Sequence, residues 1–220
     1  ALIPYLTAGD PDLATTRSLA GALRRGGADL VEIGVPFSDP IADGPVNQRA
    51  AERALGNGVT LRSCLGLAAD LRRDGCPPVV LFTYYNPIHR MGIGPFARAA
   101  AESGVDGVLV TDLPPEEAGE LRDALAAGGV DQIFLLSPTS SPERVAKVCA
   151  AAGGFIYFIS RTGVTGVRED LPPELAGQVR AARQASRLPI AVGFGISRPE
   201  HVRAIASFAD GVVVGSALVR

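Results

Sequence analysis

Reactive side chains are scarce in this chain of 220 residues, and their scarcity excludes several kinds of chemistry. The only lysine, Lys147, lies in a helix-like run that starts after Ser141. A Schiff base needs a lysine that points into a pocket, so we do not expect one here. The only histidines, His89 and His201, have no second histidine or cysteine at ligand spacing. We therefore predict neither a bound metal nor a Ser-His-Asp triad.

Cysteine and excess charge are also rare. Cys64, Cys76 and Cys149 are odd in number and lack metal-ligand spacing, which favours free thiols in a reducing compartment and a cytoplasmic location. The net charge of -2 gives no reason to expect nucleic acid or an acidic membrane as partner. No apolar run approaches the roughly 20 residues that a bilayer span needs, and the first residues do not resemble a secretory leader.

Short apolar runs alternate with helix-like runs along the whole chain. Most of the apolar runs lack a polar face, which is typical of parallel strands covered on both sides. The predicted strands are Leu2–Leu6, Leu30–Ile33, Val79–Thr83, Gly107–Val110, Gln132–Leu135, Phe155–Ile159, Ile190–Val192 and Gly211–Val214. The predicted helices are Leu13–Arg25, Leu61–Arg73, Pro95–Ser103, Glu116–Ala127, Pro142–Ala151, Pro173–Gln184 and Pro199–Ser207.

Eight strands with seven intervening helices predict one α/β domain, a (β/α)8 TIM barrel over residues 1–220. An N-terminal extra helix and the last C-terminal helix are not expected within these residues. The alternative is a doubly wound open sheet. It is less favoured because no early G-x-G-x-x-G opens a helix and because the candidate site residues are spread evenly. In a barrel, the chemistry belongs at the C-terminal ends of the strands.

The last two strand ends are rich in glycine and predict a phosphate site. Gly193-Phe-Gly-Ile-Ser197 follows the seventh predicted strand and Gly215-Ser216 follows the eighth. Glycine lets the backbone approach a ligand closely and leaves N–H groups free to bind phosphate oxygens. These are the two loops in which barrels commonly hold phosphate. Gly163-Val-Thr-Gly166 in the preceding loop could add a contact.

Two acids mark the other side of the predicted mouth. Glu32 ends the second predicted strand, where a buried carboxylate is costly unless it is used. Asp43 follows eleven residues later, in a loop whose many glycines and prolines indicate a defined shape. Tyr84 and Tyr157 bring hydroxyls that could orient one of the acids. We expect apolar neighbours to raise the pKa of a carboxyl here and suit it to proton transfer near neutral pH.

At these positions the sequence resembles the tryptophan synthase α subunit family. Glu32–Gln48, with its P-F-S-D-P-x-A-D-G-P motif, carries most of the similarity. Ile3–Pro11, Ser160–Gly166, Gly193–Ser197 and Gly215-Ser216-Ala217 also match. The resemblance implies a lyase that cleaves indole-3-glycerol phosphate to indole and glyceraldehyde 3-phosphate in tryptophan biosynthesis. It implies no cofactor in this chain and a pyridoxal-phosphate β subunit as partner in an α2β2 heterotetramer.

The resemblance also implies roles for individual residues. Glu32 resembles the general acid and base, Asp43 the acid that faces the indole nitrogen, and Tyr157 the tyrosine that supports Asp43. Thr165 falls in the loop that closes over substrate. The implied phosphate-binding residues are Gly166, Gly195, Gly215 and Ser216. The implied indole pocket consists of Tyr5, Phe82, Tyr84, Leu109, Thr111, Leu135 and Phe194.

Two other functions fit the same residues. A phosphosugar isomerase or epimerase on a similar barrel would keep the phosphate loops and use the acids for enediol chemistry or for a metal. A catalytically silent barrel that only activates a β subunit would need neither acid. Asp112, a third acid at a strand end, is expected to cap the following helix or to support the site by hydrogen bonds.

Overall fold

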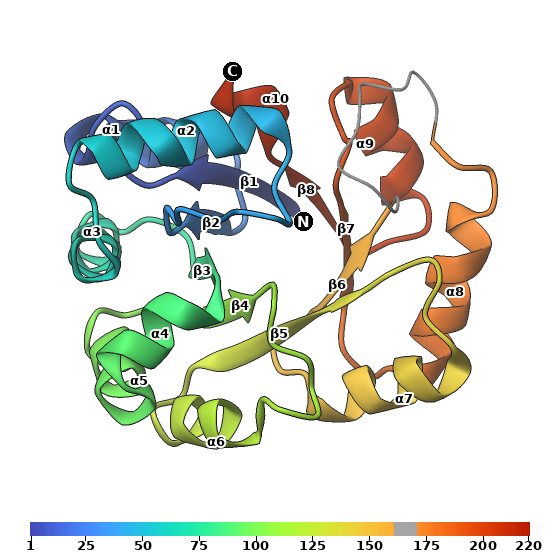
Figure 1. The fold of residues 1–220 in the computed structure, drawn as a ribbon. Helices are drawn as coiled ribbons and strands as arrows, with labels where there is room; N and C mark the ends of the chain where they lie inside the picture. The colour runs from blue at the N-terminus through green and yellow to red at the C-terminus, as the bar shows by residue number, and fades with distance from the viewer. Residues whose placement is uncertain (161–170) are drawn as a thin grey trace.

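Eight parallel strands close into a barrel in chain order, from β1 to β8, in a computed structural model that describes residues 1–160 and 171–220 (Figure 1). The strands are β1 Leu2–Thr7, β2 Val31–Gly34, β3 Val79–Thr83, β4 Gly107–Val110, β5 Asp131–Leu136, β6 Ile156–Ile159, β7 Ile190–Gly193 and β8 Gly211–Val214. The predicted (β/α)8 barrel is confirmed, and each predicted strand overlaps an observed one.

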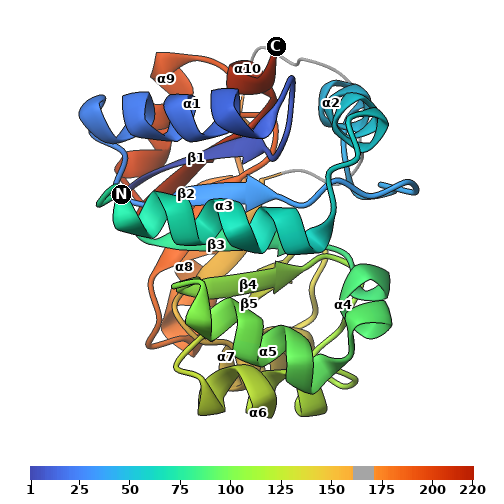
Figure 2. The ribbon, with the colours of Figure 1, turned by 90° about the vertical axis from the view of Figure 1, so that its left-hand side faces the viewer.

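Helices cover the outside of the barrel, and Figure 2 shows α1, α3 and α5 running along the strands. Their bounds are α1 Leu13–Arg25, α2 Pro45–Gly56, α3 Leu61–Arg73, α4 Tyr85–Met91, α5 Ile93–Glu102, α6 Gly119–Ala127, α7 Pro142–Ala151, α8 Leu175–Ala185, α9 Pro199–Ala206 and α10 Ser216–Val219. The sequence reading missed α2, α4 and α10. Within the described residues, none of the helices is both long enough and apolar enough to cross a membrane.

The strand residues sort into two apolar layers. Side chains that face the helices form the larger layer and include Val31 and Ile33, which flank Glu32 on β2. Side chains that face the barrel axis form the smaller layer: Ile3, Tyr5, Val80, Phe82, Leu109, Ile133, Phe155, Tyr157, Ala191 and Val213. Because neighbouring residues of a strand point to opposite faces, Glu32 points into the barrel. Its neighbours in register are Tyr5 on β1 and Val80 on β3.

Three aspartates tie strands together in the same way at the N-terminal end of the barrel. The backbone N–H of Leu2 donates to the Asp29 carboxylate at 2.7 Å, and the Asp29 N–H donates back to the Leu2 carbonyl at 3.0 Å. The same pair of bonds joins Val79 to Asp106, at 2.8 and 2.9 Å, and Ile190 to Asp210, at 3.0 and 2.9 Å. We call these three pairs the aspartate clamps. Each clamp satisfies backbone groups at the point where a strand begins.

Candidate active site

Glu32 is buried inside the barrel without a hydrogen-bond partner for one of its oxygens. Its exposed fraction is 1%, and Oε1 has no partner among the described residues. Burial raises the pKa of this carboxyl from its ordinary value of 4.5 to about 8. The predicted rise of a carboxyl pKa at the barrel mouth is therefore confirmed for Glu32. An acid with such a pKa can both give and take a proton near neutral pH.

Asp43 lies in the loop between β2 and α2 and is held by the residues around it. The Tyr84 hydroxyl, from the end of β3, donates to Oδ2 of Asp43 at 2.8 Å. The same hydroxyl accepts the N–H of Ala42 at 3.0 Å, so one side chain fixes both the acid and its backbone. From α2, Nε2 of Gln48 donates to the Asp43 carbonyl at 2.9 Å.

Burial and hydrogen bonding act in opposite directions on the charge of Asp43. Burial raises the pKa of this carboxyl, while hydrogen bonds from the side chains of Tyr84 and Asn47 lower it. The pKa of the Tyr84 hydroxyl is raised by burial and by the neighbouring Asp43 charge. Tyr84 therefore keeps its proton and remains a donor to the carboxylate.

The two acids share neighbours, which places them at one end of the barrel. Burial raises the pKa of both Tyr5 and Tyr157, and the charges of Glu32 and Asp43 raise it further in each case. Asp43 acts more strongly on Tyr5, and Glu32 more strongly on Tyr157. The structure thus brings together the two acids that the sequence singled out, and Tyr5 on β1 and Tyr157 on β6 each lie close enough to feel the charges of both.

Glycines make room for these tyrosine hydroxyls. A Cβ atom at Gly34 would collide with the Tyr5 hydroxyl, and one at Gly193 would collide with that of Tyr157. Both glycines end their strands, β2 and β7. Any larger residue at either position would displace a tyrosine from the site.

The hydroxyl that contacts Asp43 is that of Tyr84. Among the hydrogen bonds of the described residues, none joins Tyr157 to Asp43. The Tyr157 ring instead packs edge-to-face against Phe194, with ring centroids 5.8 Å apart. A catalytic role for Tyr157 stays a prediction, while the support of Asp43 that we expected from it comes from Tyr84.

The predicted phosphate loop after β7 has an unusual backbone. Phe194 has a φ of 71° and Gly195 a φ of 74°, so a non-glycine residue adopts the left-handed conformation beside a glycine. The Ser160 hydroxyl, at the end of β6, donates to the Phe194 carbonyl. After β8, a Cβ atom at Gly215 would lie 3.7 Å from Cβ of Tyr5, next to the acid site. Gly166 and Thr165, also predicted site residues, lie outside the described residues.

The residues assigned to the indole pocket line the inside of the barrel and its mouth. Tyr5, Phe82, Tyr84 and Leu109 are buried. Thr111, Leu135 and Phe194 are half-buried. Tyr5 and Phe82 pack edge-to-face, with ring centroids 5.6 Å apart. The pocket assignment itself stays a prediction.

Two further residues take structural roles. Asp112 accepts the N–H of Tyr85 at 2.7 Å, which caps α4, a helix that precedes it rather than the one that follows. Lys147 on α7 is 63% exposed and lies 3.5 Å from Glu116, as expected for a solvated helix residue. Within residues 1–160 and 171–220, no three His, Cys, Asp or Glu side chains gather as a metal site requires.

Sequence reading missed three residues that shape the site. Phe37 stacks on Tyr84 with ring centroids 5.0 Å apart, and Gln48 donates from α2 to the backbone carbonyl of Asp43. The side chain of Asn47, also on α2, lowers the pKa of Asp43. The only signal for these amides was their place in the motif-bearing segment, four and five residues after Asp43. This is the spacing that puts a side chain in the first turn of a helix within reach of the preceding loop.

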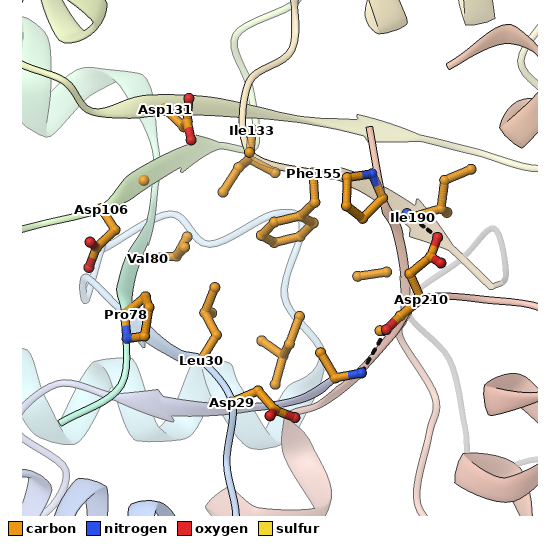
Figure 3. A pocket seen from close by; sticks show the side chains of 17 residues that line it. Asp29, Leu30, Pro78, Val80, Asp106, Asp131, Ile133, Phe155, Ile190 and Asp210 are labelled. Carbon is orange, nitrogen blue, oxygen red and sulfur yellow. Dashed lines mark hydrogen bonds between the residues drawn. The ribbon is translucent and has the colours of Figure 1, made fainter. Parts of the chain in front are cut away.

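A cavity of about 370 Å³ lies at the opposite end of the barrel (Figure 3). Its walls combine apolar residues such as Leu30, Val80 and Phe155 with the three aspartates of the clamps. Those carboxylates already accept backbone N–H groups, whereas an oxygen of Glu32 has no partner. The residues suited to proton transfer therefore lie at the C-terminal ends of the strands and not in this cavity.

Comparison with known sequences identifies close relatives of this chain. The sequence profile of the family "Tryptophan synthase alpha chain" matches residues 1–220. The tryptophan synthase alpha chain of Geobacter sp. (strain M21) is 54% identical over 220 residues, which cover 100% of this chain and 82% of the relative. That of Burkholderia mallei (strain NCTC 10229) is 52% identical, with 81% of the relative covered.

Solved structures agree with the sequence comparison. The tryptophan synthase alpha subunit of Legionella pneumophila str. Paris has a TM-score of 0.90 and 43% identity, covering 99% of this chain and 81% of that one. A chain of the tryptophan synthase complex of Pyrococcus furiosus has a TM-score of 0.91 and 43% identity, covering 100% of this chain and 88% of that one.

Proposed function

Because this chain belongs to the tryptophan synthase alpha chain family, we infer that it catalyses the reaction of that family. It is a lyase that cleaves indole-3-glycerol phosphate to indole and glyceraldehyde 3-phosphate in tryptophan biosynthesis. We propose that residues 1–220 act as one domain in this reaction. The observation that carries the assignment of residues is a buried, unpartnered Glu32 whose pKa is raised to about 8, beside Asp43.

Glu32 acts as both acid and base. At neutral pH its raised pKa keeps it protonated, and it donates that proton to C3 of the indole ring. Positive charge then develops at the ring nitrogen. The Glu32 carboxylate next removes the proton of the side-chain hydroxyl next to the ring. That hydroxyl becomes the aldehyde carbonyl, the carbon–carbon bond breaks, and its electron pair returns to the ring to release indole. Glu32 ends the cycle protonated, as it began.

Asp43 stabilises the positive ring nitrogen. A fixed carboxylate in a buried site lowers the energy of charge that develops in the transition state. Tyr84 supports this role because its hydroxyl bonds Oδ2 of Asp43 at 2.8 Å. We assign Tyr157 to the same side of the site, where it feels the charges of both acids.

Backbone N–H groups at the other side of the mouth hold the phosphate. We assign this role to Gly195, Gly215 and Ser216, and to Gly166 outside the described residues. The left-handed backbone at Phe194 and Gly195 supports it, because such a turn can direct successive N–H groups toward an anion. We assign closure over the substrate to Thr165, and the indole contacts to Tyr5, Phe82, Tyr84, Leu109, Thr111, Leu135 and Phe194.

The ring itself accepts the electrons of the broken bond, so the proposed mechanism uses no cofactor. The partner we propose is a β subunit that carries pyridoxal phosphate and consumes the indole, in an α2β2 heterotetramer. The similarity to a chain of the Pyrococcus furiosus tryptophan synthase complex supports a partner of this kind. A cytoplasmic location remains a prediction from the free cysteines Cys64, Cys76 and Cys149.

One assay tests the function directly. The purified chain is mixed with indole-3-glycerol phosphate, with and without a β subunit, and indole release is followed. We expect indole in both cases and a faster rate with the β subunit. No indole release in either case, from a chain that still activates the β subunit, would favour a silent barrel. Turnover of a phosphosugar without indole release would favour the isomerase alternative.

A further inference from the structure

Ser160 joins the ends of two neighbouring strands. It follows β6 directly, and its exposed fraction is 1%. Its backbone N–H donates to the Gly193 carbonyl at 2.9 Å, and its hydroxyl donates to the next carbonyl, that of Phe194. Strands β6 and β7 lie side by side in the barrel (Figure 1). One serine therefore holds two successive carbonyls of the β7 end toward β6.

The left-handed backbone of Phe194 makes this double contact possible. In a regular strand, successive carbonyls point to opposite neighbours, so the Phe194 carbonyl would be directed toward β8. With a φ of 71° at Phe194, both carbonyls instead reach Ser160. A non-glycine residue in this conformation costs free energy, and such residues cluster at functional sites. The hydrogen bond from the Ser160 hydroxyl offsets part of that cost.

Fixing these carbonyls also fixes the N–H groups of the same peptide units. A trans peptide is planar, and its C=O and N–H point in opposite directions. The N–H of Phe194 shares a peptide unit with the Gly193 carbonyl, and the N–H of Gly195 shares one with the Phe194 carbonyl. Both N–H groups therefore point away from β6, to the side on which β8 and Gly215-Ser216 lie.

These N–H groups are available to a ligand. Within residues 1–160 and 171–220, no acceptor is bonded to the backbone N–H of Phe194 or Gly195. The same is true there of the N–H groups of Gly215 and Ser216. Backbone donors that point toward one place bind the oxygens of a phosphate well.

We propose that Ser160 is a positioning residue for the substrate phosphate: its hydroxyl fixes the Phe194 carbonyl and so aims the N–H of Gly195 at the anion. This inference rests on the proposed function, in which Gly195 helps to bind the phosphate. A hydroxyl has one proton, and that of Ser160 is already donated to the Phe194 carbonyl. Ser160 therefore acts through the peptide unit between Phe194 and Gly195 and does not bind the phosphate itself.

Removal of this one hydroxyl tests the proposal. In Ser160→Ala the Phe194 carbonyl is released and one aimed N–H donor to a charged oxygen is lost. We expect the affinity for glycerol 3-phosphate, measured by calorimetry, to fall about tenfold. In steady-state assays of indole release, KM for indole-3-glycerol phosphate should rise about tenfold while kcat changes less than about threefold. The reason is that the phosphate is bound equally before and during bond cleavage.

A second serine at the same end of the barrel provides a matched control. Ser137 follows β5 as Ser160 follows β6, but its hydroxyl contacts Thr139 and Ser140 of its own loop, at 2.9 and 3.3 Å. Ser137→Ala should therefore leave KM and the affinity for glycerol 3-phosphate within about twofold of the wild type. Partial unfolding of either variant would lower kcat and leave KM unchanged, so the two constants separate positioning from a structural role.

A double variant separates phosphate binding from the cleavage chemistry. In a Glu32→Gln background, Ser160→Ala should again weaken glycerol 3-phosphate binding about tenfold, because the two side chains share no contact and their effects add. Three results would overturn the proposal: unchanged phosphate affinity and KM in Ser160→Ala, a loss of kcat with unchanged KM, or an equal loss of phosphate affinity in Ser137→Ala. Wild-type protein that releases no indole would instead overturn the proposed function, and calorimetry with glycerol 3-phosphate would still decide the role of Ser160.

Discussion

At Glu32, a single carboxyl group is both costly to bury and the proposed source of the acid–base chemistry. Its burial inside the barrel and the absence of a partner for Oε1 in the described structure raise its pKa to about 8. A surface glutamate would be ionised at neutral pH and could not donate a proton. Burial, rather than a charged neighbour, is therefore what raises its pKa and suits it to the acid and base roles that we propose.

Replacing Glu32 by glutamine tests this role. Glu32→Gln keeps the shape of the side chain but cannot exchange a proton, so we expect indole release to fall by at least about a thousandfold. Affinity for glycerol 3-phosphate, a probe of the phosphate loops, should change less than about threefold. Steady-state assays and calorimetry measure the two quantities. Equal losses of turnover and of phosphate affinity would make Glu32 a structural residue.

Two of the tyrosines near Asp43, Tyr84 and Tyr157, give a matched pair of variants. Tyr84→Phe removes a hydroxyl that bonds both Oδ2 of Asp43 and the N–H of Ala42. We expect kcat to fall roughly tenfold or more, since a hydrogen bond to a charged group is lost. Tyr157→Phe removes a hydroxyl that is not bonded to Asp43 in the described structure and should cost less. A larger loss in Tyr157→Phe, measured with the same assay, would show that substrate binding redirects Asp43 to Tyr157.

Candidate site residues could be singled out from the sequence only where their chemistry leaves a strong sequence pattern. Glu32 could be singled out because a charge at the end of an apolar strand demands an explanation, and Asp43 because its loop is rich in glycine and proline; the catalytic roles of both stay predictions. Gln48 was not, because a neutral amide near the start of a helix is commonplace and its hydrogen bond to the Asp43 carbonyl is seen only in three dimensions. The choice between Tyr84 and Tyr157 likewise depended on side-chain direction.

At the scale of elements, β5 carries a polar residue that the site does not use. Gln132 faces the helices, is 3% exposed, and has no partner for either Nε2 or Oε1 among the described residues. Its backbone carbonyl accepts the N–H of Gly153, which does not require the amide. The side chain is therefore a source of instability within an otherwise apolar layer.

Substituting leucine at this position should stabilise the protein. Gln132→Leu removes two unpartnered polar atoms, and we expect a gain of about 1–2 kcal/mol in the free energy of unfolding. Indole release should be unchanged because the residue faces away from the barrel axis. The control is Gln184→Leu, on the exposed face of α8, which should change stability little. A destabilised Gln132→Leu variant, measured by urea unfolding, would mean that the amide has a partner such as a buried water.

Helix bounds could be predicted from the sequence where the spacing of apolar residues and the capping residue agreed. Three helices, Leu13–Arg25, Leu61–Arg73 and Pro142–Ala151, match their predicted bounds because apolar spacing and caps agree. In each, a side chain at the start accepts a backbone N–H: Asp12, Thr60 and Ser141. By contrast, α2 was missed because its residues were taken as part of the long loop that carries Asp43, and α4 was missed because Pro87 lies within it.

For the molecule as a whole, Glu32 links stability to pH. Its pKa is about 8 in the folded chain against an ordinary value of 4.5, so the unfolded chain loses this proton first as the pH rises. Stability from this group is fully present below pH 4.5 and is lost as the pH rises through 8. Asp43 acts in the same direction because its pKa is also raised.

Unfolding curves at several pH values test this link. Between pH 5 and pH 9, wild-type protein should lose more stability than Glu32→Gln, by at most about 4–5 kcal/mol at the alkaline end. The variant should therefore be more stable but inactive above neutral pH. Parallel stability curves for the two proteins would show that the folded-state pKa of Glu32 is close to its ordinary value.

The overall architecture was the most predictable level. Eight apolar runs with helices between them leave few arrangements other than a closed parallel barrel. The aspartate clamps were not predicted, although the sequence repeats a small residue or valine before each aspartate, as in Ala28-Asp29, Val105-Asp106 and Ala209-Asp210. The repeat is short, and only the structure shows its role: each carboxylate accepts the first backbone N–H of a neighbouring strand.

These clamps have a consequence for how such an enzyme can change. They fasten the strands at the end remote from the proposed active site, so the loops that carry Asp43 and Gly195 do not have to keep the sheet in register. Mutations that retune substrate choice can accumulate in those loops while the frame beneath them stays intact. For protein engineers, the barrel should therefore accept new loops at the C-terminal ends of its strands, provided that Asp29, Asp106 and Asp210 are kept.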